Sequence, residues 1–219
     1  RMIGRREGLG DRLADGSRLL SQHLGDNSHE FAPHVKGLEL PGYEPRAMQT
    51  MALGLAVGAR GADHNRSGAY EADFSQHADR RHLTPLSAEW AVATEDQSAV
   101  FDSLILCKFI RRVLVDTYDS AADMLHMVTG WPVAAEELRQ TAQRIVTARK
   151  LFNVRAGWTP EDDTLPPRFF QLALPDDPDA RLSRDAFREA VRAYNLRRGW
   201  SAEGWPEERH LRHLRLDEC

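Results

Sequence analysis

The chain has 219 residues, 42% of them hydrophobic and 28% charged, with a net charge of −4 at pH 7; this length suits one large domain or two small ones. Acidic and basic residues are mixed without a Lys/Arg block, which argues against a nucleic-acid surface. No apolar run approaches the ~18 residues that span a bilayer, the first ten residues lack the apolar stretch of a signal peptide, and two widely spaced cysteines favour a reducing, cytoplasmic compartment.

The first predicted helix lies within residues 7–26. Its leucines recur at helical spacing, and Gly25 is suited to end it: Leu9, Leu13, Leu20 and Leu24. Residues 26–45 contain three prolines and two glycines beyond that helix. This composition predicts an ordered, non-helical connection.

A second helix is predicted from Pro45 to residue 60, because proline suits the first turn of a helix. Alanines and glycines dominate its surface and would let other backbones approach closely. Residues 60–76 lack periodicity and form a polar, glycine-bearing loop. A polar loop directly after a helix of small residues is a candidate docking site. Residues 77–87 are polar and expected to be exposed.

The next predicted helix runs over residues 94–118. Thr94 and Gln97 have the spacing of a capping box at its start, and we expect a break near residues 104–107. Another helix follows over residues 119–130 and ends on Gly130.

The last third of the chain is predicted to hold three more helices. Residues 133–157 are strongly amphipathic, with one apolar face: Leu138, Ala142, Ile145, Ala148 and Phe152. Proline-rich residues 162–179 should be extended. Ser183 caps a helix over residues 183–200, and residues 206–216 form a short last helix. Since no alternating strand pattern or repeat stands out, the predicted fold class is mostly α with long ordered connections.

Cys107 lies in the apolar run DSLILCKF, residues 102–109. The residues alone favour a buried thiol that packs as a small hydrophobic group. The alternative is a thiolate ligand, because soft sulfur suits zinc or an iron–sulfur cluster. The chain has no CxxC pair, and Cys219 is its last residue, so a metal site at Cys107 would need ligands from elsewhere.

Three further residues could carry chemistry. The residues alone favour Asp102 as a carboxylate on the exposed face of a helix. The alternative is a buried carboxylate that accepts hydrogen bonds from the N–H groups of a ligand. His64 could give or take a proton, and Arg66 could hold an anion; an ordinary polar loop is the other reading of both. The remaining histidines show no metal-binding spacing and are expected at the surface.

Separated segments of the chain resemble, in the same order, the C-terminal part of the aldehyde:ferredoxin oxidoreductase family of tungsten-pterin enzymes. They are EGLGDRLADGS, HVKGLELPGYEPRAM, RGADHNR, DSLILC, and the closing segments ARKLFNVRAGWTPEDDTLPPRFF and LRRGW. The resemblance implies irregular helical domains with long ordered connections. It makes residues 1–33 the end of the family's second domain and residues 34–219 its helical third domain.

The resemblance also implies roles for individual residues. DSLILC is similar to the family's pterin-binding motif Asp-x-x-Gly-Leu-Cys. It makes Cys107 the fourth ligand of a [4Fe-4S] cluster and Asp102 a hydrogen-bond partner of a pterin ring. Leu106 would add backbone contacts to that pterin. These residues would be neighbours because electrons pass from the pterin to the cluster.

In the segment RGADHNR, the resemblance places His64 near tungsten, where it would bind substrate or move a proton. Arg66 would contact the cofactor at a position where the family often has lysine, and the two side chains differ in hydrogen-bond geometry. The sequence departs from the family at two positions. Ile105 replaces the glycine of the pterin motif, so the backbone or the pterin there could be placed differently, and Asp63 replaces a common family residue.

The implied parent enzyme oxidises a small aldehyde with water to a carboxylic acid. Electrons would leave a tungsten or molybdenum bis-pterin through the cluster to ferredoxin or an electron-transfer subunit. The family's N-terminal domain, its first pterin motif and its CxxCxxxC run are not in this sequence. We therefore expect the 219 residues alone to be inactive and free of both cofactors.

Two readings of the chain itself remain. It is a fragment of a longer enzyme, which the non-Met first residue favours, or a separate subunit completed by a partner. A different class of function is also open: a cofactor-free helical module for assembly or binding, suggested by Ile105 and by the missing cluster ligands. The sequence leaves open the aldehyde, the choice between tungsten and molybdenum, and whether the protein is a homo-oligomer.

Overall fold

The computed structural model describes residues 1–75 and 78–217, so Cys219 lies outside the described residues. Helices dominate the described chain, and the strands in it are the two of one short hairpin. The predicted mostly α fold class is therefore confirmed. None of the helices in the described ranges is both long enough and apolar enough to cross a membrane.

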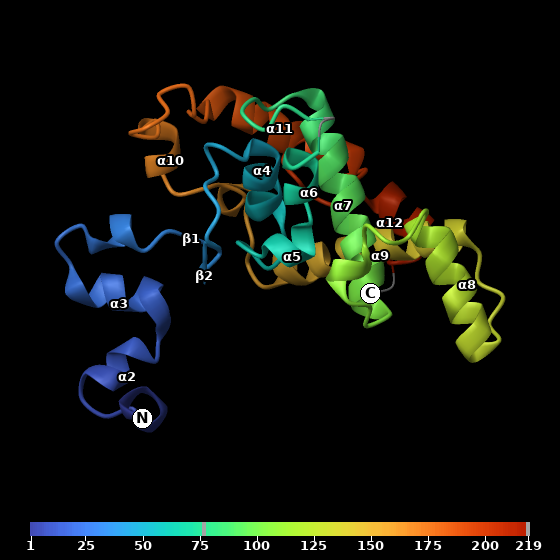
Figure 1. Cartoon of the computed structure of the whole chain (residues 1–219), viewed down its shortest axis with the longest axis horizontal. Coiled ribbons are helices and arrows are strands. Elements are labelled where there is room, and N and C mark those ends of the chain that lie inside the picture. Colours follow the sequence, from blue (N-terminus) through green and yellow to red (C-terminus); the bar gives the residue numbers. More distant parts are fainter. Residues whose placement is uncertain (76–77, 218–219) are drawn as a thin grey trace.

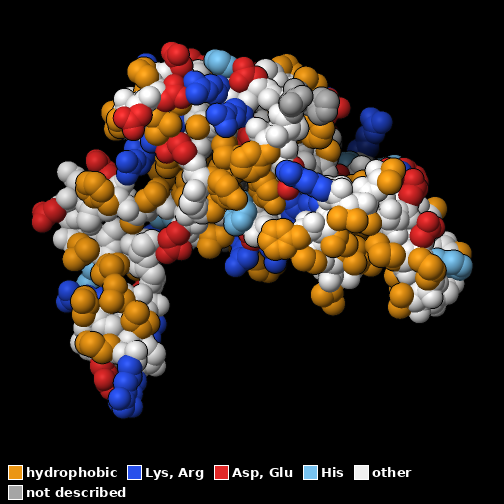
Figure 2. All heavy atoms as spheres, in the orientation of Figure 1, with side chains coloured by type: hydrophobic (Ala, Val, Ile, Leu, Met, Phe, Trp, Pro, Cys, Tyr) orange, Lys and Arg blue, Asp and Glu red, His pale blue; other side chains and the backbone are white. Residues whose placement is uncertain are grey.

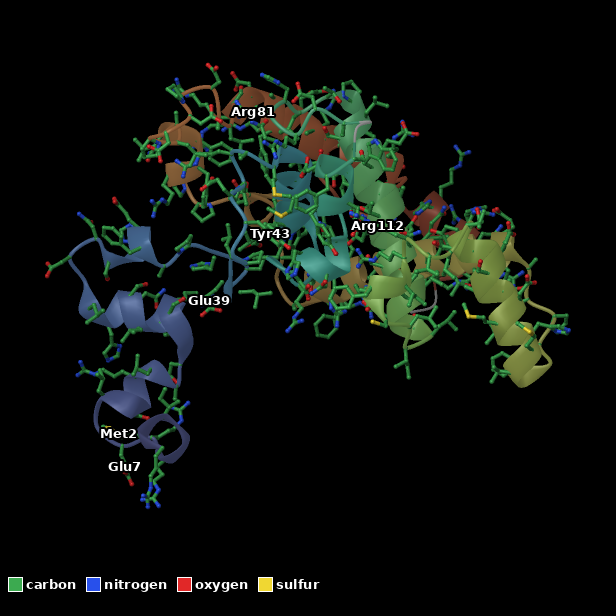
Figure 3. All side chains as sticks on the ribbon, viewed as in Figure 1. Met2, Glu7, Glu39, Tyr43, Arg81 and Arg112 are labelled. Carbon is green, nitrogen blue, oxygen red and sulfur yellow. The ribbon has the colours of Figure 1, made fainter. Side chains whose placement is uncertain are left out.

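The first 33 residues form an arm that projects away from the rest of the molecule (Figure 1). Met2 and Glu7 lie at its far end (Figure 3). The arm holds short helices instead of the single predicted one: α1 (Met2–Arg5), α2 (Leu9–Leu13), α3 (Gly16–Leu24) and the 3₁₀ helix η1 (Ser28–Phe31). Gly16 has a φ of +83°, a conformation outside the helical region, so the predicted helix is interrupted there.

Gly25 ends α3 with a positive φ, as predicted. The arm then joins the main body through an antiparallel hairpin of β1 (His34–Val35) and β2 (Leu38–Glu39). The sequence analysis missed these strands, because two residues are too few for an alternating pattern. Lys36 and Gly37 both have positive φ, the geometry of a two-residue hairpin turn that matches the twist of the strands.

Helix α4 (Gln49–Val57) is buried along its whole length, as expected for a helix that is apolar on all sides. It begins at Gln49 and not at Pro45, so the predicted start was wrong. Its small residues do admit close neighbours: a Cβ added to Gly54 would lie 2.4 Å from the Ser67 hydroxyl oxygen. The predicted loop that follows is partly helical, with α5 (His64–Ser67) and α6 (Tyr70–Asp73).

Helix α7 (Pro85–Ser103) begins nine residues before the predicted start at Thr94. Thr84 and Ser87 form its capping box. The Thr94 hydroxyl lies inside the helix and donates to the carbonyl oxygen of Trp90 at 2.8 Å. The Thr-x-x-Gln pattern was therefore misleading, because a threonine inside a helix can also bond to the preceding turn.

The predicted break at residues 104–107 is confirmed, since α7 ends at Ser103. The prediction that the helix continues to residue 118 is wrong. A 3₁₀ helix, η2 (Lys108–Ile110), is followed by non-helical residues up to α8 (Thr117–Thr129). Gly130 ends α8 in the left-handed conformation, as predicted.

The remaining helices are α9 (Ala135–Arg155), η3 (Pro160–Asp162), α10 (Arg168–Gln171), α11 (Arg184–Arg197) and α12 (Glu208–Leu214). The Ser183 side chain caps α11, as predicted. The segment predicted to be extended contains α10. The buried line of α9 includes Leu138, Ala142 and Val146, while Ala148 and Phe152 are exposed, so the predicted apolar face was only partly correct.

Helix α7 is the central element of the main body. It packs against α4, α5, α9 and α11. A charged cluster fixes α11 to it: the buried Arg198 guanidinium contacts Glu95 at 2.6 Å and also Asp96. The Tyr194 hydroxyl donates to Glu95 at 2.5 Å. One guanidinium therefore neutralises two buried carboxylates across the interface between α7 and α11.

We expect Arg198→Ala to lower the free energy of unfolding by about 3–5 kcal/mol, because it leaves Glu95 and Asp96 as buried charges without a cation. Arg192→Ala is the control, since the Arg192 side chain is exposed on the same helix and its loss should change stability by less than about 0.5 kcal/mol. Urea unfolding measures both. A loss below about 1 kcal/mol for Arg198→Ala would contradict a structural role of this cluster.

Asp73 of α6 caps the start of α4. Its carboxylate accepts backbone N–H groups from Thr50 at 3.1 Å and from Met51 at 2.8 Å. Burial raises the pKa of Asp73 to about 6, because desolvation of the charge outweighs these hydrogen bonds. A raised folded-state pKa means that the contribution of Asp73 to stability is greatest at low pH and is lost as the pH rises through about 6.

Asp73→Asn keeps an oxygen acceptor but removes the ionisation. The wild-type free energy of unfolding, measured relative to this variant, should fall by roughly 2–3 kcal/mol between pH 4 and pH 8, because the ordinary aspartate pKa lies well below 6. Urea titrations at several pH values test this, with Asp123→Asn on the exposed face of α8 as control. A difference that does not change with pH would refute the raised pKa.

Candidate functional site

The end of α7 is a Schellman motif, a common helix end with two specific backbone hydrogen bonds. The N–H of Ile105 donates to the carbonyl of Asp102 at 3.3 Å, and the N–H of Leu106 donates to the carbonyl of Phe101 at 2.9 Å. This motif needs a residue in the left-handed conformation, which is usually glycine. Ile105 holds that position with a φ of +58°.

Isoleucine is an unusual residue at such a position, because a β-branched side chain is strained in the left-handed region. Ile105 is also 92% exposed, so packing does not offset the strain. A glycine at this position, as in the Asp-x-x-Gly-Leu-Cys pattern, would adopt the left-handed conformation without strain. Ile105 adopts the left-handed conformation at an energetic cost.

The turn carries Cys107 to the surface. Its thiol is free and exposed, and its backbone is extended. The reading of Cys107 as a buried small hydrophobic residue is therefore wrong, because the Schellman turn directs the chain out of the core. An exposed thiol can reach a group held by another part of a protein.

Asp102 and Lys108 face each other across this turn. The Lys108 ammonium lies 2.9 Å from the Asp102 carboxylate and also donates to the carbonyl of Ser98 at 3.1 Å. The Asp102 side chain is 30% exposed, so it is half-buried and not the freely solvated helix carboxylate that the residues alone favoured. Burial lowers the pKa of Lys108, although Asp102 opposes this effect.

The second group of candidate residues lies on α5. Asp63 caps this helix by accepting the N–H groups of Asn65 at 3.0 Å and Arg66 at 3.1 Å. Its other oxygen contacts the Arg60 guanidinium at 2.8 Å. Although burial acts in the opposite direction, the N–H of Arg66 and the side chain of Arg60 hold the pKa of Asp63 below its usual value.

His64 belongs to an aromatic cluster. Its ring lies 5.5 Å from that of Tyr43 and 5.8 Å from that of Tyr70, measured between centroids. Figure 3 labels Tyr43 beside α6 and the hairpin. The Tyr70 hydroxyl accepts a hydrogen bond from the buried Arg111 at 2.9 Å. His64 therefore sits against tyrosine rings, and Arg66, two residues later, lies beside a cavity.

That cavity has a volume of about 310 Å³ and is bordered by α5, α7, α9 and the end of α4. Its charged lining residues are Arg60, Asp63, Arg66, Glu95 and Arg149. The sequence analysis did not single out Arg149, Lys108 or Glu95. Lys108 directly follows Cys107, which was a usable signal, but Arg149 lies in the middle of a long amphipathic helix and carried none.

The structure brings Asp102, Leu106 and Cys107 together on one helix end. The charges of Arg66, Asp102 and Asp63 all act on Arg149, so the two groups of candidate residues are electrostatic neighbours. Within residues 1–75 and 78–217, no three His, Cys, Asp or Glu side chains are placed to hold a metal ion together.

Comparison with known proteins gives consistent matches. A family model described as aldehyde ferredoxin oxidoreductase, domains 2 and 3, matches residues 1–216. The tungsten-containing aldehyde ferredoxin oxidoreductase of Pyrococcus furiosus is 32% identical over 220 residues, 99% of this chain and 36% of that protein. The enzyme of the same name from Thermococcus kodakarensis is 32% identical over 92% of this chain and 33% of its own length. The chain thus spans about a third of the length of these relatives.

A solved structure shares the fold. It is the active-site complex BamBC of benzoyl coenzyme A reductase with 1,5-dienoyl-CoA, which superposes with a TM-score of 0.71 at 17% identity. The match covers 99% of this chain and 38% of that chain. At this identity the likeness concerns the fold alone.

We expect Ile105→Gly to raise the free energy of unfolding by about 1 kcal/mol, because glycine adopts the left-handed conformation without strain. Val113→Gly is a matched control, since Val113 is also an exposed β-branched residue but has no positive φ; this change should not stabilise the chain. Urea unfolding measures both variants. Equal effects at the two positions would show that residue 105 is not strained.

Proposed function

Because the chain belongs to the aldehyde ferredoxin oxidoreductase family, which its match over residues 1–216 shows, we propose that it is the C-terminal part of an enzyme that oxidises aldehydes to carboxylic acids. Residues 1–33 would be the end of the second domain and residues 34–219 the third. The separate arm formed by the first 33 residues supports this division (Figure 1).

The observation that carries the proposal is the paired placement of Asp102 and Cys107 on either side of one Schellman turn. The exposed thiol of Cys107 suits the fourth ligand of a [4Fe-4S] cluster, because thiolates hold such clusters. The half-buried carboxylate of Asp102 suits an acceptor for the N–H groups of a pterin. Leu106 lies between them in the chain and would offer its backbone to the same pterin.

When bound, a tungsten or molybdenum bis-pterin and its cluster supply the two-electron oxidation. The residues of this chain would hold and position these groups. Arg66 would contact the cofactor with its guanidinium in place of the usual lysine ammonium, and Asp63 would orient it by capping α5. His64 would bind the aldehyde or move a proton, as the family resemblance implies. Lys108 would have to share Asp102 with the pterin.

The rest of the enzyme would supply the remaining cluster ligands and cover this face. Several apolar side chains near the turn are more than half exposed: Ile105, Phe109, Val113 and Val115. Figure 2 shows hydrophobic side chains gathered on the arm and along the edge of the main body toward α8. Exposed apolar surface of this kind is typical of a face that another part of a protein covers.

Electrons would pass to ferredoxin or an electron-transfer subunit, and the enzyme would work in the cytoplasm on a small aldehyde. The 219 residues alone would hold neither cofactor and would be inactive. A homo-oligomer is compatible with this proposal. A cofactor-free helical module is the second candidate, and the ion pair that engages Asp102 with Lys108 favours it.

In the complete protein that contains this chain, Cys107→Ser should remove most of the cluster, because serine is a poor substitute for a thiolate ligand. The iron content and the electron paramagnetic resonance signal of the reduced cluster should both fall by about half or more, with aldehyde-dependent dye reduction lost. Cys219→Ser is the control and should leave all three unchanged.

Asp102→Asn should lower the tungsten or molybdenum content of the same preparation, while Asp123→Asn on α8 should not. A complete protein that holds no iron and neither tungsten nor molybdenum, or a Cys107→Ser variant with an unchanged cluster signal, would contradict the proposal. The first of these results would favour the cofactor-free module.

A further inference from the structure

The cavity beside α5 contains a guanidinium without a counterion. Arg149 of α9 lines the cavity and, within residues 1–75 and 78–217, donates no hydrogen bond and forms no ion pair. Burial lowers the pKa of Arg149, and the neighbouring charge of Arg66 adds to this effect. Arginine nevertheless stays protonated in proteins, so Arg149 presents a half-buried positive charge to the cavity.

The carboxylates near Arg149 are already engaged. Asp102, which acts on Arg149 most strongly among them, contacts the Lys108 ammonium at 2.9 Å. Asp63 binds Arg60 at 2.8 Å and caps α5. Glu95 contacts Arg198 at 2.6 Å and accepts the hydroxyl of Tyr194. Arg149 is a half-buried cation, and the neighbouring carboxylates are paired with other groups. An external anion would therefore stabilise it.

The charged residues that line the cavity, together with those that contact them, carry a net positive charge. Five cations meet four carboxylates: Arg60, Arg66, Lys108, Arg149 and Arg198 against Asp63, Glu95, Asp96 and Asp102. Neutralising this shell takes one further negative charge. The position of that charge follows from Arg149, because the other three guanidinium groups each lie within 4 Å of a carboxylate.

The walls of the cavity favour an organic ligand over a bare ion. Gly58, Ala59 and the exposed ring of Phe152 form an apolar side. A volume of about 310 Å³ lies at the lower end of the range for small-molecule sites. The arginines lie on the charged side, where a guanidinium can bind two oxygens of one anion at once.

We propose that this cavity binds the oxyanion of a small organic molecule, a carboxylate or a phosphate, through Arg149 with support from Arg66. The apolar part of the ligand packs against Gly58, Ala59 and Phe152. The inference goes beyond the proposed oxidoreductase role, with which it shares Arg66, and it rests first on Arg149, a residue that the proposed role does not use.

The test is isothermal calorimetry on the complete protein at low ionic strength, with benzoate, inorganic phosphate and neutral benzamide as probes. We expect the wild type to bind at least one of the two anions and to bind benzamide at least tenfold more weakly. Tighter binding of benzoate assigns a carboxylate ligand, and tighter binding of phosphate assigns a phosphate ligand. Failure of the wild type to bind either anion would overturn the proposal.

Arg149→Gln should weaken binding of the anion about ten- to hundredfold, the effect of losing a charge-assisted hydrogen bond. Arg192→Gln removes an exposed arginine of α11 and should leave the affinity unchanged. Equal affinity in the wild type and in Arg149→Gln would overturn the proposal.

A second measurement needs no variant. Phenylglyoxal modifies arginine side chains, and mass spectrometry of the modified wild type reports each position. The bound anion should slow modification of Arg149 at least severalfold and leave Arg192 unaffected. Equal modification of Arg149 with and without saturating anion would overturn the proposal even if the glutamine variant did not fold. Because both measurements are independent of metal content, their failure is distinguishable from failure of the oxidoreductase proposal.

Discussion

The contact between Arg198 and the two acids of α7 is the interaction on which the rest of the main body depends. It joins the end of α11 to the middle of α7, and α7 in turn packs against α4, α5 and α9. A buried guanidinium stabilises this arrangement only while both carboxylates stay within reach, since unpaired buried charges are costly. The cluster therefore holds the middle of α7 against α11, upstream of the helix end that carries Asp102 and Cys107.

A helix end is a suitable place for residues that face a group outside the chain. The Schellman turn satisfies the last backbone groups of α7 and then directs the chain outward. Asp102 stays half-buried beside Lys108, while Cys107 is exposed a few residues later. Ile105 adopts this geometry with backbone strain, because its side chain disfavours the left-handed conformation that the turn requires. Such strain is typical of positions constrained by function.

The exposed apolar side chains around residues 105–115 and the projecting arm have a common consequence. Both leave hydrophobic surface in water that an isolated small domain would bury. The chain spans about a third of the length of its relatives, so the rest of such a protein offers the surface that would cover these regions. The cavity beside α5 differs from them, because five of the residues that line it are charged.

The sequence by itself determined the features that depend on residues close together in the chain. These are the mostly α class, the break after Ser103, the helix ends at Gly25 and Gly130, and the helix start at Ser183. These follow from hydrogen bonds within one turn. It missed the hairpin and misplaced the start of α7, because those signals are short or ambiguous. It identified Asp102 and Cys107 as candidates through their motif, but their exposure was decided by the tertiary structure, as was the unpaired Arg149. Burial and ion pairing depend on residues about a hundred positions apart in the chain, such as Glu95 and Arg198. A local sequence pattern cannot show that such residues meet in the folded structure.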